Sequence, residues 1–138
     1  MRNIEAPRTE ARQVSIGVRT AGTIFGTLRL PLEDEPLAAV AIHPATAVPQ
    51  RLYSGFAEYL ATRGFAVLSY DYRGTGASGS ARENRRLRMR DWMDVDVPAA
   101  AAWLRERYPE LPHVAVGHSL GGHALALNNG GEGLQGFM

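Results

Sequence analysis

The stretch VAVGHSLGGHALAL, at residues 114–127, constrains the fold more than any other part of the chain. Its first residues form a short apolar run typical of a buried β-strand, and its last residues favour a helix. Between them lies a G-x-S-x-G motif, made of Gly117, His118, Ser119, Leu120 and Gly121. Side chains two residues either way from the serine would collide with the crossing strand and helix, so glycine is needed there. The pattern predicts a strained turn that exposes Ser119 at the carboxyl end of a sheet.

The other strands are predicted from two kinds of apolar pattern. VSIGVRT and TIFGTLRLP alternate around a turn at Ala21-Gly22, which indicates an opening hairpin. LAAVAIHP and FAVLSYDY are continuous apolar runs, typical of strands buried on both faces of a parallel sheet. Residues 1–13 are polar and are expected to form a loose N-terminal segment.

Two helices are predicted between these strands. From Pro49 to Gly64 the apolar residues recur at helical spacing, with Gly64 at the position of a C-cap glycine; they are Tyr53, Phe56, Ala57 and Leu60. Asp91 to Tyr108 also has an apolar face, formed by Trp92, Val95, Ala99 and Trp103. Pro98 leaves two alternatives: the helix begins near Asp96 with Pro98 in its first turn, or a short turn over 91–95 is kinked against the rest of the helix. Strands alternating with helices predict an α/β fold with a mostly parallel sheet and crossover helices.

Composition limits the classes of function. The 138 residues, 45% apolar and 21% charged, predict one globular domain. A net charge of +1 gives no electrostatic reason for a nucleic-acid or anionic membrane partner. The chain has no cysteine, so it has neither disulfides nor thiolate metal sites, and no cofactor or metal is predicted from His, Asp or Glu spacing. Without an apolar leader or a run long enough to span a bilayer, we expect a cytoplasmic protein.

Two further patterns suggest binding functions that their context does not support. Gly74, Gly76 and Gly79 form G-x-G-x-x-G directly after a strand, as in dinucleotide-binding domains, but no apolar helix follows them. The second pattern is a basic run of Arg82, Arg85, Arg86, Arg88 and Arg90. No aromatic residues interleave with it to stack bases. We therefore interpret it as a solvated face, balanced by Glu83, Asp91, Asp94 and Asp96.

The elbow motif predicts nucleophilic chemistry at Ser119. A serine at the mouth of a helix has the helix N-terminus and the Leu120 N–H beside it, and both stabilise a developing oxyanion. A serine hydroxyl is a poor nucleophile unless an imidazole, oriented by a carboxylate, takes its proton. The motif therefore predicts Ser119 as a nucleophile with oxyanion stabilisation beside it.

From Val14 onward the chain resembles the N-terminal half of an α/β-hydrolase of the serine aminopeptidase-like and lysophospholipase-like branch. The matching pieces are the opening hairpin, AIHPAT, YDYRGTGASG and GHSLGG. In that family a His-Gly loop supplies the second oxyanion donor, whereas this chain has His43-Pro44. Proline has no N–H, so the resemblance implies the Ala45 N–H as that donor. It also implies that Asp71 and Arg73 brace loops near the site.

None of the four histidines is expected to be the base. His118 should point away from Ser119, His123 lies a turn into the helix, His113 lies at the far end of its strand, and the family's counterpart of His43 is usually structural. In the family, the acid and the histidine follow later strands. Residues 134–138, LQGFM, resemble the first residues of the next strand, cut short.

The chain is therefore expected to be one partial domain over residues 1–138, truncated after the helix that follows Ser119 and inactive by itself. Truncation would leave the Ser119 strand as an unpaired apolar edge prone to self-association. The substrate of the full-length parent would be a small-molecule acyl compound. Two alternatives remain: a non-catalytic remnant that acts as a pairing or binding module, and, with less support, a dinucleotide-binding domain.

Overall fold

The computed structural model describes residues 5, 7–19 and 22–138, and in these residues six strands form one sheet in the order β1-β2-β4-β3-β5-β6. The strands are β1 (Thr9–Gly17), β2 (Thr23–Pro31), β3 (Ala38–His43), β4 (Phe65–Tyr70), β5 (His113–Gly117) and β6 (Leu134–Phe137). The hairpin β1–β2 and the pair β2–β4 are antiparallel, and β4, β3, β5 and β6 run parallel to one another. The predicted α/β fold with a mostly parallel sheet is confirmed.

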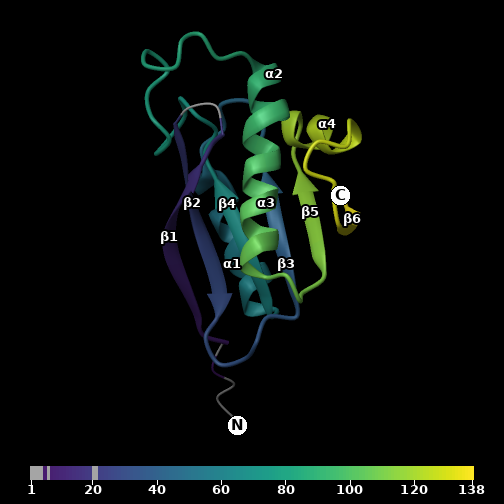
Figure 1. The fold of residues 1–138 in the computed structure, drawn as a ribbon. Helices are drawn as coiled ribbons and strands as arrows, with labels where there is room; N and C mark the ends of the chain where they lie inside the picture. Colours follow the sequence, from purple (N-terminus) through teal and green to yellow (C-terminus); the bar gives the residue numbers. More distant parts are fainter. Residues whose placement is uncertain (1–4, 6, 20–21) are drawn as a thin grey trace.

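The helical segments cover both faces of this sheet (Figure 1). They are the 3-10 turn η1 (Gln50–Tyr53), α1 (Ser54–Thr62), α2 (Met89–Asp91), the π-helical turn η2 (Trp92–Asp96), α3 (Val97–Arg107) and α4 (Leu120–Ala126). In Figure 1, α3 crosses one face of the sheet and α1 lies behind the other. Gly64 follows α1 with a φ of +98°, as expected of a residue that ends a helix in the left-handed conformation.

The strands β3 and β4 each contribute to two apolar clusters, as the continuous apolar runs predict. In β3, Ala39 and Ala41 belong to the cluster that includes α3, whereas Val40 and Ile42 belong to the cluster that includes Ala57 of α1. Because successive side chains of a strand point to opposite faces, a run without polar residues is buried on both. Because β3, β4 and β5 are parallel, this burial holds their carboxyl ends together at one end of the sheet.

Two expectations about the ends of the sheet are wrong. Residues 9–13 are not loose, because β1 begins at Thr9, where its Cα lies opposite that of Pro31 of β2. Residues 1–4, 6, 20 and 21 lie outside the described residues, and with them part of the expected loose segment and of the expected turn at Ala21-Gly22. Nor is β5 an unpaired edge: the Gly117 N–H donates to the Met138 carbonyl over 2.8 Å, so the predicted last strand, β6, forms the edge.

Pro98 accounts for the irregular helix that precedes β5. Proline has no N–H to donate to the carbonyl four residues earlier, so an α-helical hydrogen bond is missing at this point. The structure accommodates it with the wider turn η2, in which the Val97 N–H donates to the Trp92 carbonyl five residues earlier. Pro98 lies in the first turn of α3, which begins at Val97, as the first alternative predicts. The second alternative predicts a kinked turn over 91–95, and a π turn lies there instead.

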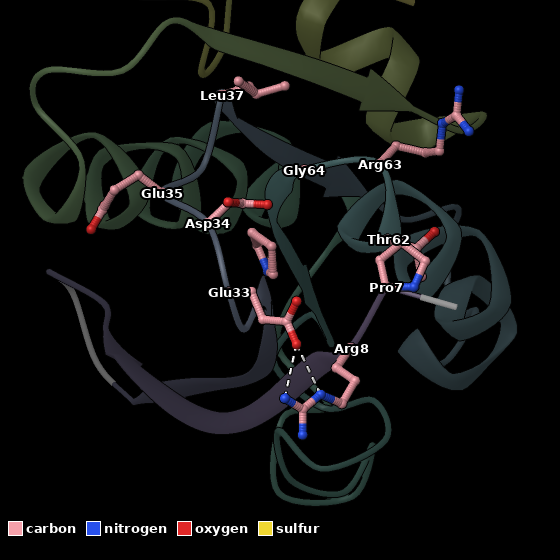
Figure 2. A pocket seen from close by; sticks show the side chains of 10 residues that line it. Pro7, Arg8, Glu33, Asp34, Glu35, Leu37, Thr62, Arg63 and Gly64 are labelled. Carbon is pink, nitrogen blue, oxygen red and sulfur yellow. Dashed lines mark hydrogen bonds and ion pairs between the residues drawn. The ribbon is translucent and has the colours of Figure 1, made fainter. Parts of the chain in front are cut away.

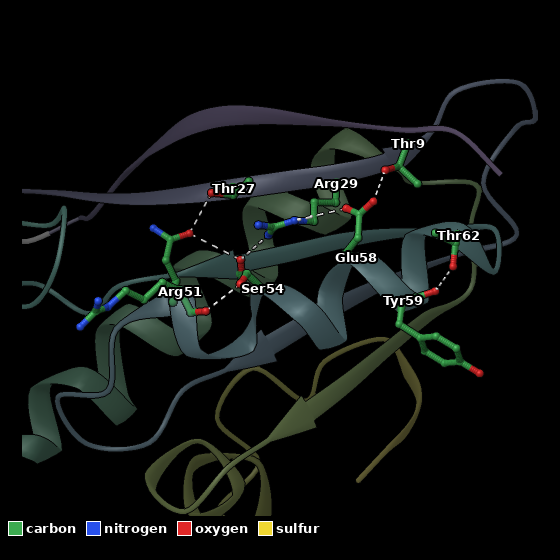
Figure 3. A network of polar contacts seen from close by, with 10 residues as sticks. Thr9, Thr27, Arg29, Arg51, Ser54, Glu58, Tyr59 and Thr62 are labelled. Carbon is green, nitrogen blue, oxygen red and sulfur yellow. Dashed lines mark hydrogen bonds and ion pairs between the residues drawn. The ribbon is translucent and has the colours of Figure 1, made fainter. Parts of the chain in front are cut away.

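On the α1 side, the sheet carries a row of polar side chains (Figure 3). Thr27 of β2 donates to the Gln50 side chain over 2.9 Å. Arg29, also in β2, lies 3.3 Å from the Ser69 hydroxyl and 3.8 Å from a carboxylate oxygen of Glu58 in α1. These contacts satisfy polar groups that the helix covers, and so they fix how α1 lies on the sheet.

A buried ion pair joins the loop after β4 to the helix before β5. The Asp96 carboxylate, which is fully buried, accepts from the Arg73 Nε over 2.7 Å and from the Arg73 backbone N–H over 2.9 Å. Burial raises the pKa of Asp96, although its bonds to Arg73 act in the opposite direction. The carboxylate depends on its partner because a lone charge in this position would be desolvated without compensation.

We predict that Asp96→Ala lowers the free energy of unfolding by about 3–5 kcal/mol, because it leaves the Arg73 guanidinium buried without its carboxylate. Asp94→Ala is the matched control, since Asp94 pairs with Arg90 at the surface over 3.3 Å and exposed pairs contribute about 1 kcal/mol or less. Urea unfolding of both variants measures the difference, and equal losses would contradict the prediction.

Candidate active site

Ser119 occupies a strained turn between β5 and α4. Its φ of 53° and ψ of −107° lie outside the regions that non-glycine residues usually adopt. The turn is held on both sides, since the His118 N–H donates to the His43 carbonyl over 3.0 Å and the His123 N–H donates to the Ser119 carbonyl over 2.9 Å. The predicted geometry is therefore present, with the exposed Ser119 at the carboxyl end of β5.

The glycines of the motif are required by close backbone contacts. A Cβ on Gly117 would lie 2.5 Å from the Gly122 nitrogen, and one on Gly121 would overlap the carbonyl of His43. The contact at Gly117 brings α4 against β5, and the contact at Gly121 brings α4 against the end of β3. Only glycine at both positions allows the helix to begin directly after Ser119.

The loop after β3 places Ala45 at the same edge of the sheet. Its N–H, the predicted second oxyanion donor, donates to the Tyr53 hydroxyl over 2.9 Å. The Pro44 carbonyl accepts from the Tyr72 hydroxyl over 2.7 Å, which joins the loop after β3 to the loop after β4. Leu120 is the first residue of α4, where backbone N–H groups have no intrahelical acceptor. The roles of Ala45 and Leu120 stay predictions.

No histidine in the described part of the chain is hydrogen-bonded to the Ser119 side chain. His43 is fully buried and contacts the Tyr70 hydroxyl through Nδ1 over 2.7 Å. His113 lies 2.8 Å from the Tyr108 carbonyl, and His118 lies 2.9 Å from the Tyr53 hydroxyl. His123 is exposed on α4. The arrangement gives Ser119 no base from these four side chains.

Asp71 and Arg73 contact loops, as the resemblance implies. Asp71 accepts from the backbone N–H and the side chain of Gln50, over 2.8 and 2.9 Å, and from the Ala77 N–H over 3.0 Å. A Cβ on Gly76 would overlap this carboxylate, which explains a glycine there with a φ of +47°. Asp71 thus ties its own loop to η1, and Arg73 ties it to η2 through Asp96.

The glycine-rich loop after β4 lacks the context of a dinucleotide site. Residues 80–87 contain turns and no helix, and α2 begins only at Met89. Among the described residues, no group of three or more His, Asp or Glu side chains is placed to hold a metal ion. Nor does any helix in this part of the chain combine the length and the apolar character needed to cross a bilayer.

The arginine run is exposed, but its balancing acids were partly misassigned. Only Arg90 of this run forms an ion pair within the described residues, with Asp94. Glu83 and Asp91 accept from the backbone N–H groups of Ser80 and Arg88. Asp96 is not on the solvated face at all, because it is buried with Arg73. Asp96 follows Trp92 by four residues, a spacing that puts both side chains on the same, apolar side of a helix and so indicates that Asp96 is buried.

A separate pocket lies at the opposite end of the sheet (Figure 2). It has a volume of about 490 Å³ and includes Leu37 and Gly64, which directly precede β3 and β4. Arg8 and Glu33 form an exposed ion pair of 2.8 Å at its rim. In open α/β sheets ligands bind at the carboxyl ends of the strands, so the edge with Ser119 is the candidate site.

Two polar partners of the site are not predicted by the sequence. Tyr53 packs against the apolar cluster of α1, as the helical pattern predicts, and its hydroxyl also contacts Ala45 and His118. Gln50 was given no role, yet it bonds the Asp71 carboxylate. Spacing along the chain contains no signal for either contact, because both depend on how η1 lies against distant loops.

The sheet order, the crossing helices and the strained serine turn define an α/β-hydrolase fold. The chain belongs to the serine aminopeptidase, S33 family, whose family model matches residues 34–130. The resemblance drawn from the sequence is thereby confirmed at the level of the family.

Individual relatives agree with this family. Cutinase 2 of Thermobifida cellulosilytica and cutinase cut1 of Thermobifida fusca are each 28% identical over 97 residues, 70% of this chain but 36% and 30% of those proteins. The chain thus spans about a third of the length of these curated relatives.

Solved structures show the same fold. A carboxyl esterase from Bacillus coagulans matches 92% of the chain with a TM-score of 0.75 and 20% identity, and the match covers 43% of that protein. A dienelactone hydrolase-like promiscuous phosphotriesterase from metagenomic libraries matches 94% with a TM-score of 0.70 and 23% identity, and covers 57% of that protein.

We predict that Gly121→Ala lowers the free energy of unfolding by at least about 1–3 kcal/mol, because the new methyl group meets the rigid His43 backbone. The control is Gly55→Ala in α1, where an added Cβ meets nothing within 4 Å. Alanine there should stabilise the helix by about 0.5–1 kcal/mol. Thermal or urea unfolding that ranked the two variants in the opposite order would contradict the steric role of Gly121.

Burial lowers the pKa of His43 from its ordinary 6.5 to about 4. Protonation therefore favours the unfolded chain, so stability is complete above about pH 6.5 and falls as the pH drops towards 4. The difference corresponds to roughly 3 kcal/mol. His43→Gln should lack this component, and unfolding free energies of both proteins between pH 7 and 4 measure it. Parallel pH profiles would show that His43 is not kept neutral by burial.

Proposed function

We propose that the protein is a serine hydrolase that transfers an acyl group from an ester, thioester or amide to water through Ser119. The observation that carries the proposal is the backbone of Ser119, with its φ of 53° between β5 and α4. A non-glycine residue in such a conformation costs about 1–3 kcal/mol, and strain of this kind concentrates at functional sites. Family membership and the esterase-like relatives support the same conclusion.

In the proposed reaction the Ser119 oxygen attacks the acyl carbon while a general base takes its proton. The electron pair of the carbonyl moves to oxygen, where the N–H groups of Leu120 and Ala45 stabilise the charge. The intermediate collapses, and the leaving alcohol, thiol or amine departs with the proton from the base. Water then releases the acyl group by the same steps, which regenerates the serine.

The base of this reaction is none of the four histidines of the chain. His43 is buried with its pKa lowered to about 4. His113 contacts a backbone carbonyl at the amino end of β5, and the His118 ring contacts Tyr53. The reaction therefore requires a base other than these four histidines. Labelling by a fluorophosphonate tests the serine in this chain, because fluoride leaves readily and hydroxide at alkaline pH can take the serine proton in place of a histidine. Without a positioned base the labelling is slow.

We predict that a fluorophosphonate probe at alkaline pH labels the chain slowly at Ser119 and that Ser119→Ala abolishes the labelling. Ser15→Ala is the matched control, because Ser15 is exposed on β1 at a distance along the sheet from the elbow strand. Peptide mass spectrometry identifies the modified residue. A folded sample without labelling, or labelling that survives Ser119→Ala, would contradict the proposal, and the former would favour a non-catalytic pairing module.

A further inference from the structure

The Tyr53 hydroxyl connects the two loops that meet at the candidate site. It accepts from the Ala45 N–H over 2.9 Å and lies 2.9 Å from Nδ1 of His118. The Tyr53 and His118 rings also meet edge to face, with centroids 5.9 Å apart. A phenol has one proton, so the arrangement that satisfies both contacts has Tyr53 accepting from Ala45 and donating to His118.

The proposed oxyanion donor is thus already engaged. A backbone N–H has one proton, and an oxyanion would have to accept it at about 2.7–3.1 Å. The phenol oxygen already lies within that range of the Ala45 nitrogen. An acyl oxygen bonded to Ala45 would therefore have to replace the Tyr53 hydroxyl, since both oxygens cannot occupy the same position.

Burial explains why Ala45 needs a partner when no substrate is bound. Ala45 is 7% exposed, and an N–H buried without an acceptor is costly. Tyr53 supplies this acceptor from the last residue of η1, whose first residue is bonded to the Asp71 carboxylate. The backbone that bears Tyr53 is anchored, while its half-buried side chain ends beside the exposed His118. A hydroxyl displaced from Ala45 keeps a partner in His118.

We propose that Tyr53 is a positioning residue that keeps the Ala45 N–H occupied and oriented until an acyl oxygen replaces its hydroxyl. The inference rests on the proposed function of Ser119 and adds a group that competes with the substrate for one oxyanion donor. Tyr53 does not itself react: its hydroxyl exchanges a hydrogen bond to Ala45 for one with water, and no covalent bond changes.

The test compares Tyr53→Phe with Tyr59→Phe, which removes a hydroxyl from an exposed tyrosine of α1. The first measurement is NMR on the 138-residue chain. Tyr53→Phe should speed exchange of the Ala45 amide proton about two- to tenfold, the factor that corresponds to the typical net stability of one hydrogen bond, and should move the ¹⁵N shift of His118 Nδ1. Tyr59→Phe should change neither.

The second measurement is the rate at which a fluorophosphonate probe labels Ser119. With the competing hydroxyl removed, Tyr53→Phe should be labelled about two to ten times faster than the unmodified chain, the factor expected for one net hydrogen bond. Tyr59→Phe should match the unmodified chain. If Tyr53→Phe does not fold, His118→Ala decides the matter: it keeps the phenol but removes the partner that a displaced hydroxyl would retain, so displacement from Ala45 becomes less favourable and labelling should be slower than in the unmodified chain.

The possible failures are distinguishable. Equal or slower labelling of Tyr53→Phe, with labelling still lost in Ser119→Ala, would overturn the inference and leave the proposed function intact. An Ala45 amide whose exchange does not respond to Tyr53→Phe would also overturn the inference. If no variant is labelled, the proposed function fails. The inference then fails with it, because no reaction at Ser119 would place a substrate oxygen against the Ala45 N–H.

Discussion

The close approach of α4 to the end of β3 is the contact on which the rest of the candidate site depends. The Cα of Gly121 lies so near the His43 carbonyl that no side chain fits between them. The same carbonyl accepts the His118 N–H, so one backbone oxygen fixes the turn on either side of Ser119. The strain at Ser119 persists because these surrounding contacts determine its conformation.

Hydrogen bonds of buried polar groups link the neighbouring loops to one another. Asp71 bonds η1 and its own loop, and Arg73 bonds Asp96 in the π turn before α3. Trp92 stacks on Tyr72 with ring centroids 5.3 Å apart and donates through its indole nitrogen to the Arg73 carbonyl. Because each group is both buried and bonded, moving one loop would leave a polar atom unsatisfied in another. The loops at this edge of the sheet therefore behave as a unit.

The predictions that failed share a physical cause. The sequence predicts that Asp96 balances the arginine run on a solvated face, but the helix turns it towards Arg73. The Ser119 strand was expected to be an open edge, whereas residues 134–138 pair along it. The ring of Tyr53 packs against the apolar cluster of α1 as predicted, but the pattern does not predict that its hydroxyl lies between two loops. In each case the partner is distant in the chain; helical spacing indicates that Asp96 faces inward, but local pattern does not specify which group it meets there.

Local pattern by itself determined the elements, the elbow and the family. Apolar runs without polar residues predict strands buried on both faces, and glycines two residues either side of Ser119 predict the close packing that the structure shows. Only the tertiary structure decided which polar atoms meet: that the Ala45 N–H donates to Tyr53, and that His43 stays buried against Tyr70. Backbone geometry follows from short-range sterics, whereas these pairings depend on how separate loops pack at one edge of the sheet.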